Sequence, residues 1–495
     1  MAKIIFPGTK SESNKLSRLV NKGELNRIRQ GIYTDAPLAD IPELVINKWH
    51  ELAAHLCPDA VASYRSAVEL TPNEGRIYLV GDVPSRRYVH VGPWLTFDLS
   101  PGNSSLGTEP FLPHIMRSSL PRRLLENLSE SRSHGSGRKT LGQPWVEEEL
   151  CKILQRYGEP EINKIRDEAR SMSKKLDLEA EFYQLDQVIG AILSSQTVEG
   201  TLTTDLAIAV ARREPFDANR IDRFHSLADY LGKTEFRPAS FEFNSAAWRN
   251  LSFFESYFSN FIEGTEFLID EAEDIVFSGK IIKNRTADSH DIMAVYRLVH
   301  DHQEMLTVPE DPDHFLELLQ SRHALMMEQR PEKNPGILKT QQNKAGNTVF
   351  VLPEDLTGTL TRGFEIYQAL PPGMARAIFM QFLISECHPF DDGNGRLSRV
   401  FLNSELVSCD MCKIIVPTVA RENYLNALRQ STREGYFRTL VRAFCQLQQY
   451  TASIPWMDYG EARETLESDK ADQLPDAGLG IFNRKLRNFR IQLPN

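Results

Sequence analysis

The sequence has 495 residues, which is enough for two or three domains with a sizeable core. Hydrophobic residues make up 41% and charged residues 25%, the balance of an ordinary globular protein. A net charge of −10 and a pI near 5.7 argue against nucleic-acid binding by the whole chain, although they leave room for a local basic patch.

The cysteine pattern and the N-terminus predict a protein of a reducing compartment. Six cysteines are too sparse for a disulfide framework, and the single C-x-x-C, Cys409 with Cys412, has no second pair nearby. The first residues form a short apolar run that Pro7 and Gly8 interrupt, which is not a signal peptide. No window approaches the roughly eighteen apolar residues of a membrane span. We therefore expect a cytoplasmic protein without membrane contact.

Residues 1–35 are locally basic. Seven basic side chains there face only Glu12, Glu24 and Asp35. Positive side chains in excess are what a phosphate backbone attracts, so a DNA contact is expected in this stretch if the chain has one. The basic residues are Lys3, Lys10, Lys15, Arg18, Lys22, Arg27 and Arg29.

The same stretch predicts a helix followed by two short strands. Ser11 can cap a helix, Gly23 turns the chain, and Gly31 separates apolar residues at 25–28 from those at 32–33. Helix, strand, glycine turn and strand form the second half of a winged helix. Residues 19–33 also resemble the start of AbiEi-type abortive-infection antitoxins, which are winged-helix repressors. The resemblance implies DNA binding, while a docking or dimerisation module is the alternative, and the oligomeric state is left open.

Residues 41–128 mix a helix at 44–56 with short extended runs, so residues 1–128 are expected to form an α+β module. The antitoxin resemblance extends weakly over this part. Residues 129–144 contain a Ser-His-Gly-Ser-Gly run and are the predicted linker. Residues 145–250 have helical periodicity and are expected to be a helical connecting region. The extended runs lie at 77–80, 88–91 and 94–97.

The most informative stretch is His-Pro-Phe-Asp-Asp-Gly-Asn-Gly-Arg-Leu-Ser-Arg, residues 388–399. Upstream, apolar residues recur every four positions from 374 to 382, so a buried helix is predicted up to Pro389, with His388 at its end. Helical periodicity restarts just after Gly395. The glycine-bearing turn is therefore the start of a second helix, where free backbone amides and the positive end of the dipole favour phosphate.

The residue types in this stretch indicate nucleotide transfer to a hydroxyl. His388 can accept a proton from a hydroxyl, and Asp392 offers a hard oxygen ligand to Mg²⁺. Gly393 and Gly395 let the backbone approach an anion closely.

Three polar side chains of the same stretch extend the phosphate site. Asn394 adds a side-chain donor beside the two glycines. Arg396 and Arg399 lie three residues apart on the predicted helix, so both can bind phosphate oxygens through two N–H groups.

This stretch resembles, position for position, the HPFx(D/E)GNGRxxR signature of the Fic family, protein nucleotidyltransferases that mostly attach AMP to hydroxyl side chains of other proteins. The resemblance implies that His388 is the general base and Asp392 the magnesium ligand. It also implies that residues 393–396 bind the α- and β-phosphates of ATP and that Arg399 binds the γ-phosphate.

The family also uses a self-inhibition pattern, (S/T)xxxE(G/N), and the chain contains it twice, at residues 195–200 and 259–264. The second copy follows an apolar helix and leads directly into the stretch that carries the signature. Since that is its place in Fic proteins with an N-terminal inhibitory helix, we choose Glu263 as the inhibitory residue. Its carboxylate would pair with Arg399 and exclude the γ-phosphate.

Residues 335–340 and 348–352 predict a β-hairpin around Asn343 to Gly346, at the place where Fic proteins carry a flap that aligns the target. The usual arginine of that flap is replaced by Lys339. Downstream, Tyr424 is implied to line the nucleotide base pocket. Residues 433–436 read Arg-Glu-Gly-Tyr where the family commonly has Asn-Glu-Gly-Asp, so base preference is left open.

The sequence therefore predicts an α+β, mostly α, chain with a helical Fic domain and hairpin flap at 251–455, behind the winged-helix module. Residues 456–495 are expected to be a polar tail. The predicted function is transfer of AMP from ATP, with Mg²⁺, to a Ser, Thr or Tyr hydroxyl of a protein, autoinhibited by Glu263. The alternatives are a DNA-binding regulator or toxin–antitoxin-type protein with the Fic domain as a sensing arm, and an enzyme that removes AMP.

Overall fold

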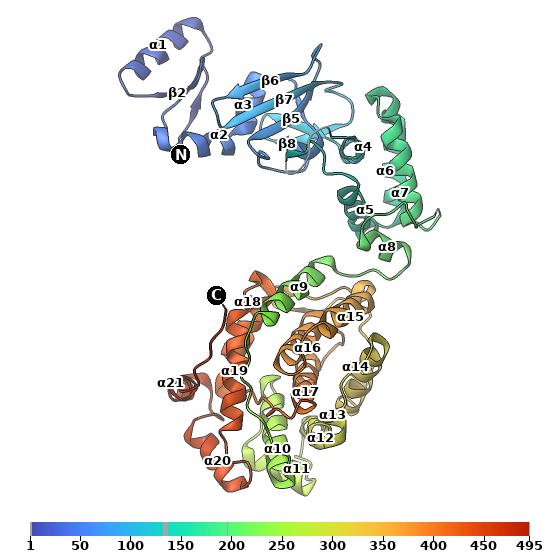
Figure 1. Cartoon of the computed structure of the whole chain (residues 1–495), viewed down its shortest axis with the longest axis vertical. Helices are drawn as coiled ribbons and strands as arrows, with labels where there is room; N and C mark the ends of the chain where they lie inside the picture. Colours follow the sequence, from blue (N-terminus) through green and yellow to red (C-terminus); the bar gives the residue numbers. More distant parts are fainter. Residues whose placement is uncertain (1, 132–136, 196, 495) are drawn as a thin grey trace. The chain divides into compact units, whose positions relative to one another are not determined.

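The computed structural model describes residues 2–131, 137–195 and 197–494, and the chain divides into two compact units (Figure 1). Unit 1 is Met1–Arg213 and unit 2 is Glu214–Asn495. The fold is α+β and mostly helical, as predicted, and the strands are concentrated in unit 1. The boundary after Arg213 falls inside the stretch 145–250 that the sequence predicted as one connecting region.

Unit 1 begins with one helix on a small antiparallel sheet. The strands β1 (Ile4–Ile5), β2 (Asn26–Arg29) and β3 (Ile32–Thr34) are ordered β1-β3-β2, and helix α1 (Lys10–Asn21) lies between the first two in sequence. Thr9, rather than Ser11, caps α1 by accepting a hydrogen bond from the backbone N–H of Glu12. The predicted helix and both predicted strands are present.

A six-stranded mixed sheet follows, in the order β6-β7-β5-β4-β9-β8, with β5 parallel to β7 and β4 parallel to β9. The three extended runs predicted from the sequence are its strands β5, β6 and β7. The helix predicted at 44–56 is divided into α2 and α3 at Lys48. The elements are η1 (Leu38–Asp40), α2 (Ile41–Asn47), α3 (Trp49–Leu56), β4 (Val61–Ala62), η2 (Tyr64–Ala67), β5 (Arg76–Gly81), β6 (Arg87–Val91), β7 (Leu95–Pro101), β8 (Thr108–Leu112) and β9 (Ile115–Ser118).

Five helices complete unit 1 around a second apolar core. The predicted linker 129–144 lies among them: its residues 132–136 are outside the described part, and its far end is held to α4, because Leu141 N–H donates to the Asn127 side chain at 2.9 Å. The turn-forming residues of this stretch predicted a linker, but they could not predict the hydrogen bond that holds it to α4. The helices are α4 (Leu120–Leu128), α5 (Gln143–Tyr157), α6 (Glu159–Leu176), α7 (Glu179–Ile192) and α8 (Asp205–Ala211).

Unit 2 is a helical body with one short hairpin. Within the described residues, no helix combines the length and the apolar composition that a membrane crossing requires. Its elements are α9 (Ala218–Gly232), α10 (Ser245–Ile262), α11 (Ile269–Ser278), α12 (Thr286–His300), α13 (His302–Leu306), α14 (Pro312–Met326), η4 (Pro331–Lys333), β10 (Lys344–Ala345), β11 (Thr348–Val349), α15 (Pro353–Gln368), α16 (Met374–Cys387), α17 (Asn394–Val407), η5 (Thr418–Ala420), α18 (Arg421–Glu434), α19 (Arg438–Ala452), α20 (Tyr459–Ser468) and α21 (Pro475–Leu486).

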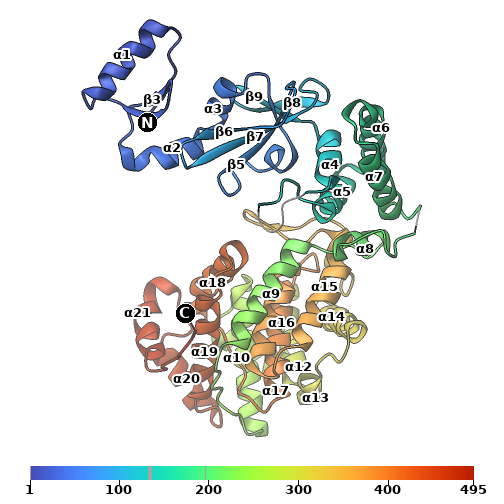
Figure 2. The ribbon, with the colours of Figure 1, turned by 45° about the horizontal axis from the view of Figure 1, so that its top comes forward.

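The helices α16 and α17 lie side by side in the centre of unit 2 (Figure 2). Almost every side chain of both is buried, which explains why the apolar residues of α16 are not confined to one face. The loop that joins them, residues 388–393, is therefore fixed at both ends by packed helices. This loop carries the signature.

The predicted hairpin is present but is shorter than the sequence indicated. β10 and β11 have two residues each, pair antiparallel, and turn at Gly346, whose φ is +57°. Residues 335–340, expected to be its first arm, hold a turn at 335–336 followed by irregular backbone. The backbone N–H of Lys339 donates to the Pro389 carbonyl at 2.9 Å and ties this segment to the signature loop.

The C-terminal segment differs from the expected polar tail. It forms α20 and α21, which bury Ala462, Leu466 and Phe482 against the rest of unit 2. The many charged residues between these three positions concealed the apolar spacing that packs the helices.

Candidate functional site

The end of α16 and the start of α17 set the shape of the signature loop. His388 has φ +48°, a left-handed conformation that ends α16, and Pro389 follows it without a backbone N–H. The Asn394 side chain closes the loop, since its Oδ1 accepts from the Phe390 N–H at 2.9 Å and its Nδ2 donates to the Phe390 carbonyl at 2.8 Å. The predicted phosphate donor of Asn394 is thus used within the loop.

His388 lies at the edge of a cavity and is half-buried. Its Nδ1 is 3.4 Å from the Ser385 carbonyl oxygen, and its ring lies flat against Phe350 of the hairpin segment, with ring centroids 3.8 Å apart. Burial lowers the pKa of His388 to about 4. The imidazole is therefore neutral at pH 7 and can accept a proton.

The cavity has a volume of about 320 Å³ and brings together five of the site residues that the sequence predicted, whereas Asp392, Gly393, Asn394 and Arg396 do not line it. Such a volume is in the range of small-molecule sites. Its wall includes Glu263, Phe350, His388, Gly395, Arg399 and Tyr424, which come from α10, the hairpin segment, α16, α17 and α18.

Arg399 is buried and is held by the last turn of α10. Its Nε donates to Ser259 Oγ at 3.0 Å, and its Nη2 donates to the Ser259 carbonyl at 2.9 Å and to Glu263 Oε1 at 2.7 Å. Glu263 also lies directly over the start of α17, because a Cβ placed on Gly395 would be 2.2 Å from Glu263 Oε1. A larger residue at Gly395 would therefore require the Glu263 carboxylate to shift.

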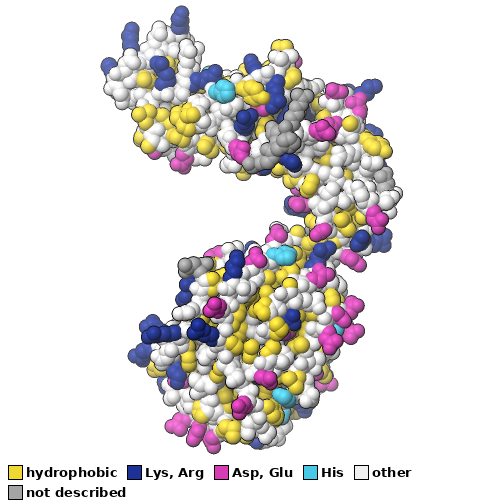
Figure 3. All heavy atoms as spheres, in the orientation of Figure 1, with side chains coloured by type: hydrophobic (Ala, Val, Ile, Leu, Met, Phe, Trp, Pro, Cys, Tyr) yellow, Lys and Arg dark blue, Asp and Glu magenta, His cyan; other side chains and the backbone are white. Residues whose placement is uncertain are grey.

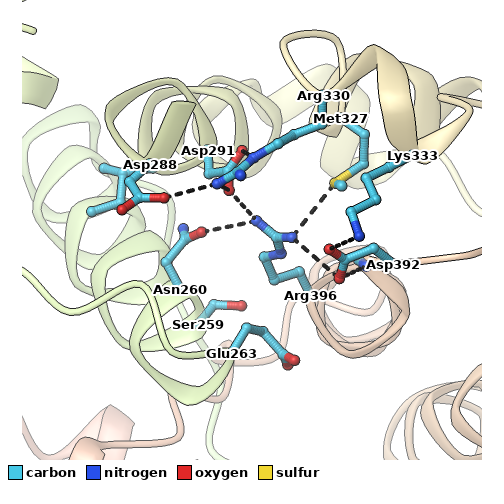
Figure 4. Close-up of polar contacts among 12 residues, drawn as sticks. Ser259, Asn260, Glu263, Asp288, Asp291, Met327, Arg330, Lys333, Asp392 and Arg396 are labelled. Carbon is cyan, nitrogen blue, oxygen red and sulfur yellow. Dashed lines mark hydrogen bonds and ion pairs between the residues drawn. The ribbon is translucent and has the colours of Figure 1, made fainter. Parts of the chain in front are cut away.

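Arg396, the other arginine of the signature, has a separate set of acidic and polar partners (Figure 4). Its Nη1 lies 3.0 Å from Asp291 Oδ2 and 3.4 Å from Asn260 Oδ1. Asp392, the predicted magnesium ligand, is half-exposed, 3.9 Å from Arg396 Nη2, and accepts the Gly393 N–H at 2.7 Å. The two arginines are thus both paired, one with Glu263 and the other with Asp291.

Tyr424 is buried in the cavity wall, where its hydroxyl accepts a hydrogen bond from Gln381 Nε2 at 2.8 Å. Burial raises the pKa of the Tyr424 phenol, so the side chain is neutral. An aromatic ring with a fixed hydroxyl is suited to contact with a nucleotide base.

Sequence reasoning missed His323, which supports the signature loop from α14. Its ring stacks on Phe390 with centroids 3.7 Å apart, its Nε2 donates to the Asp392 carbonyl at 3.0 Å, and its Nδ1 accepts the Gly336 N–H at 2.9 Å. Burial lowers the pKa of His323 to about 4, which matches a neutral ring with one donor and one acceptor nitrogen.

The hairpin segment is fastened to the same loop by Asn343 and Lys339. Asn343 Nδ2 donates to the carbonyls of His388 at 3.1 Å and Phe390 at 3.0 Å. Lys339 Nζ donates to the Cys387 carbonyl at 3.0 Å, at the C-terminal end of α16, where a cation is favourable. Lys339 is thus buried under the loop instead of reaching into the cavity.

The first copy of the glutamate pattern, residues 195–200, lies in unit 1, and its Gln196 is outside the described residues. The second copy is the one that provides the contact with Arg399. Among the residues that the structure describes, no group of three or more His, Cys, Asp or Glu could hold a metal ion. Cys412 of the C-x-x-C is buried, and burial raises the pKa of its thiol to about 12.

Comparison with known proteins finds a family model that matches part of this site. Residues 309–406 match the Fic/DOC family model. The chain carries a Fic domain. The matched stretch includes His323 and the whole signature from His388 to Arg399, and the resemblance predicted from the sequence is confirmed for this part of the chain.

Relatives resemble the Fic-containing part at low identity. The protein adenylyltransferase Fic of Drosophila erecta is 24% identical over 246 residues, 48% of each chain. The chain therefore spans about half the length of the curated relatives it matches. Among solved structures, a Fic-1 fragment from C. elegans has a TM-score of 0.36 at 18% identity, over 66% of this chain and 94% of that one. A Fic domain-containing signalling protein from Bacteroides thetaiotaomicron has a TM-score of 0.34 at 19% identity, over 56% and 99%.

Proposed function

We propose that the chain is a protein adenylyltransferase that transfers AMP from ATP to a Ser, Thr or Tyr hydroxyl of a target protein. The observation that carries this proposal is the cavity in which His388, Gly395 and Arg399 meet, a neutral base beside a helix start and a buried cation. The Fic/DOC match and the names of the relatives support it.

In the proposed reaction the target oxygen attacks the α-phosphorus of ATP. The bond from that phosphorus to the oxygen bridging toward the β-phosphate breaks, and pyrophosphate leaves. If His388 Nδ1 donates to the Ser385 carbonyl, Nε2 is the acceptor that takes the hydroxyl proton. The first amides of α17 have no partners within the helix and stabilise the negative charge of the phosphates.

Asp392 fits a magnesium site of the kind that nucleotides complete. Its carboxylate is half-exposed and a single carboxylate is a usual protein contribution, since Mg²⁺ takes one or two of them together with substrate phosphates. Magnesium would neutralise phosphate charge in the site. Asp392 would hold it, with its own orientation fixed by the Gly393 N–H.

The proposed enzyme is held in a low-activity state by Glu263. Its carboxylate binds the Arg399 guanidinium, the group that a γ-phosphate would need, and covers Gly395. Glu263 is the residue that ends α10, so the inhibitory contact depends on one helical turn.

The test is mass spectrometry of the full chain incubated with ATP and Mg²⁺. Glu263→Gly is expected to gain the mass of AMP, on itself or on an added target, while the wild type gains little. Adding His388→Ala to that variant is expected to lower the rate about 10²- to 10⁴-fold, the usual contribution of a positioned base.

Glu266→Gly is the matched control, because Glu266 is an exposed glutamate three residues further on. It is expected to behave as the wild type. If Glu263→Gly gains no AMP, transfer is wrong as the function; if the wild type gains as much as the variant, only the inhibitory role is wrong.

Removal of AMP is the alternative use of the same residues. Glu263 shares the cavity wall with His388, and a glutamate there could position a water for hydrolysis of the phosphodiester. In that case the wild type, and not Glu263→Gly, removes AMP mass from a target that carries it.

A second candidate function is DNA binding by residues 1–35. The basic side chains Lys10, Lys15 and Arg18 of α1 and Arg27 of β2 are exposed, and Lys and Arg are visible on the N-terminal elements in the surface view (Figure 3). We propose that these side chains contact the phosphate backbone of DNA. The test is whether the chain binds the promoter of its own gene with an affinity that falls as salt is added.

A further inference from the structure

Arg396 has strong partners on one side of its guanidinium and weak ones on the other. Its Nη1 is fixed by Asp291 at 3.0 Å and contacts Asn260 at 3.4 Å. Its Nη2 has only the Met327 sulfur at 3.5 Å and Asp392 at 3.9 Å. Its Nε has no hydrogen-bond partner among the described residues, although the side chain is only 4% exposed.

Such a distribution leaves the hydrogen-bonding capacity of this buried arginine partly unused. The guanidinium carries five N–H donors, and a buried donor without a partner is unfavourable. A thioether sulfur is a weak acceptor. The edge formed by Nε and Nη2 is therefore under-satisfied, and its Nη2 faces Asp392 (Figure 4).

Asp291, on α12, determines that the Nε and Nη2 edge of Arg396 is the one left without strong acceptors. Its side chain is 3% exposed, and its Oδ2 contacts both Arg396 Nη1 and, at 2.9 Å, Arg330 Nη2. Arg330 Nε lies 3.3 Å from Asp291 Oδ1. Because Arg330 holds both carboxylate oxygens, Asp291 cannot turn, and it fixes Arg396 by one amino group only.

We propose that Asp291 is a positioning residue for nucleotide binding, which presents the Nε and Nη2 edge of Arg396 to a phosphate group of ATP beside Asp392. The inference rests on the proposed function, since it needs a nucleotide in the site. Phosphate oxygens supply the acceptors that this edge lacks, and an arginine oriented in advance loses little freedom when the ligand binds. Asp291 itself touches neither substrate nor metal.

Asp288 provides a matched comparison. It lies one helical turn before Asp291 on α12 and contacts the same Arg330 Nη2 at 2.8 Å, but it has no contact with Arg396 among those that the structure gives. A purely structural role for this network predicts similar effects at both positions. A positioning role predicts an effect on ATP from Asp291 alone.

The experiment measures binding of ATP with Mg²⁺, and of AMP, by calorimetry on the full chain carrying Glu263→Gly, so that Glu263 does not compete for Arg399. Asp291→Asn and Asp288→Asn are added separately. Asp291→Asn is expected to weaken ATP binding about 10- to 100-fold, the effect that loss of a residue orienting a ligand has at metal sites. The affinity for AMP is expected to change much less. Asp288→Asn is expected to bind both ligands with the affinities of the Glu263→Gly parent.

Equal ATP affinities for the two variants would overturn the proposal. If Asp291→Asn does not fold, as thermal melting would reveal, Asp291→Glu and Asp288→Glu replace the pair, because the longer side chain keeps the charge but displaces Arg396. Equal affinities there overturn it as well. If the Glu263→Gly parent binds ATP but the two variants have equal affinities, only the role of Asp291 is wrong. If the parent binds no ATP, the proposed function itself is wrong.

Discussion

His323 is a buried imidazole whose two nitrogens are both used by the backbone, one donating to Asp392 and the other accepting from Gly336. A second proton on this ring would leave two donors where the loop offers one acceptor. The neutral form is therefore part of the folded state, which connects the stability of the signature loop to pH.

Stability is expected to fall as pH drops from 6.5 toward 4. The His323 pKa is near 6.5 when unfolded and about 4 when folded, so between these values the unfolded chain binds the extra proton. The pKa difference of His323 corresponds to a loss of about 3 kcal/mol in the free energy of unfolding once the pH is below both values. Denaturant unfolding of the wild type and His323→Gln at several pH values measures it.

The glutamine variant keeps a donor and an acceptor but does not titrate in this range, so its stability is expected to fall less steeply. His225→Gln, at an exposed histidine of α9, is the control and should follow the wild type. Parallel pH profiles for wild type and His323→Gln would contradict the assignment of a neutral ring.

At the scale of elements, the hairpin segment does more than present strands at the surface. Asn343 holds it to the signature loop, and Phe350 covers the face of His388. The ring of Phe350 keeps water from the imidazole, and burial is the main reason that the His388 pKa is low.

Phe350→Ala is expected to raise the His388 pKa from about 4 toward 6.5, because the imidazole becomes hydrated. Transfer needs the neutral base, so the acid limb of the pH–rate profile should move to higher pH while the rate at pH 8 changes less. Rates of AMP transfer by the Glu263→Gly chain between pH 4 and 8 measure this.

Val349→Ala is the matched control for the hairpin, since Val349 is exposed one residue earlier. An acid limb that stays in place in Phe350→Ala would show that the stacked ring does not set the protonation of His388.

The sequence predicted the helices α16 and α17 and the loop between them, because apolar spacing, Pro389 and the glycines of the signature are local signals. The contacts that hold the site could not be predicted in that way. Asn343 reaches the loop from 45 residues upstream and Asn260 reaches Arg396 from 136 residues upstream. Nothing local to Asp291 or His323 distinguishes them from ordinary helical residues, and their partners are set only when the helices pack.

At the scale of the whole molecule, all the described residues of the cavity belong to unit 2, whereas the basic N-terminal stretch belongs to unit 1. The two proposed activities are therefore expected to be separable by mutation. The elements of residues 1–35 were predicted from turn residues and apolar spacing, but which ligand their charges meet cannot be read from those signals.

If α1 binds DNA, reversing Lys10, Lys15 and Arg18 to glutamate is expected to weaken binding uniformly over sequences. The slope of log affinity against log salt should fall by about 3, one for each phosphate that the chain no longer neutralises. Fluorescence anisotropy with the full chain and a labelled promoter fragment measures both quantities.

The same reversal at Lys164, Lys174 and Lys175 of α6 is the control, because these lysines are exposed and the net charge changes equally. If the α1 and α6 reversals weaken DNA binding equally, the DNA contact does not lie on α1. His388→Ala should leave DNA binding unchanged.

The ion pair between Glu263 and Arg399 has a consequence for how the proposed enzyme would respond to its surroundings. The guanidinium is almost sealed from water, at 6% exposure, while the carboxylate side chain is 31% exposed. A nearby anion stabilises a buried cation, so binding of ATP would exchange the Glu263 carboxylate for the γ-phosphate as the partner of Arg399. The tethered Glu263 carboxylate and free ATP would then compete for Arg399, so the fraction of the site that holds ATP would rise with the ATP concentration. The supply of ATP itself would act as the signal.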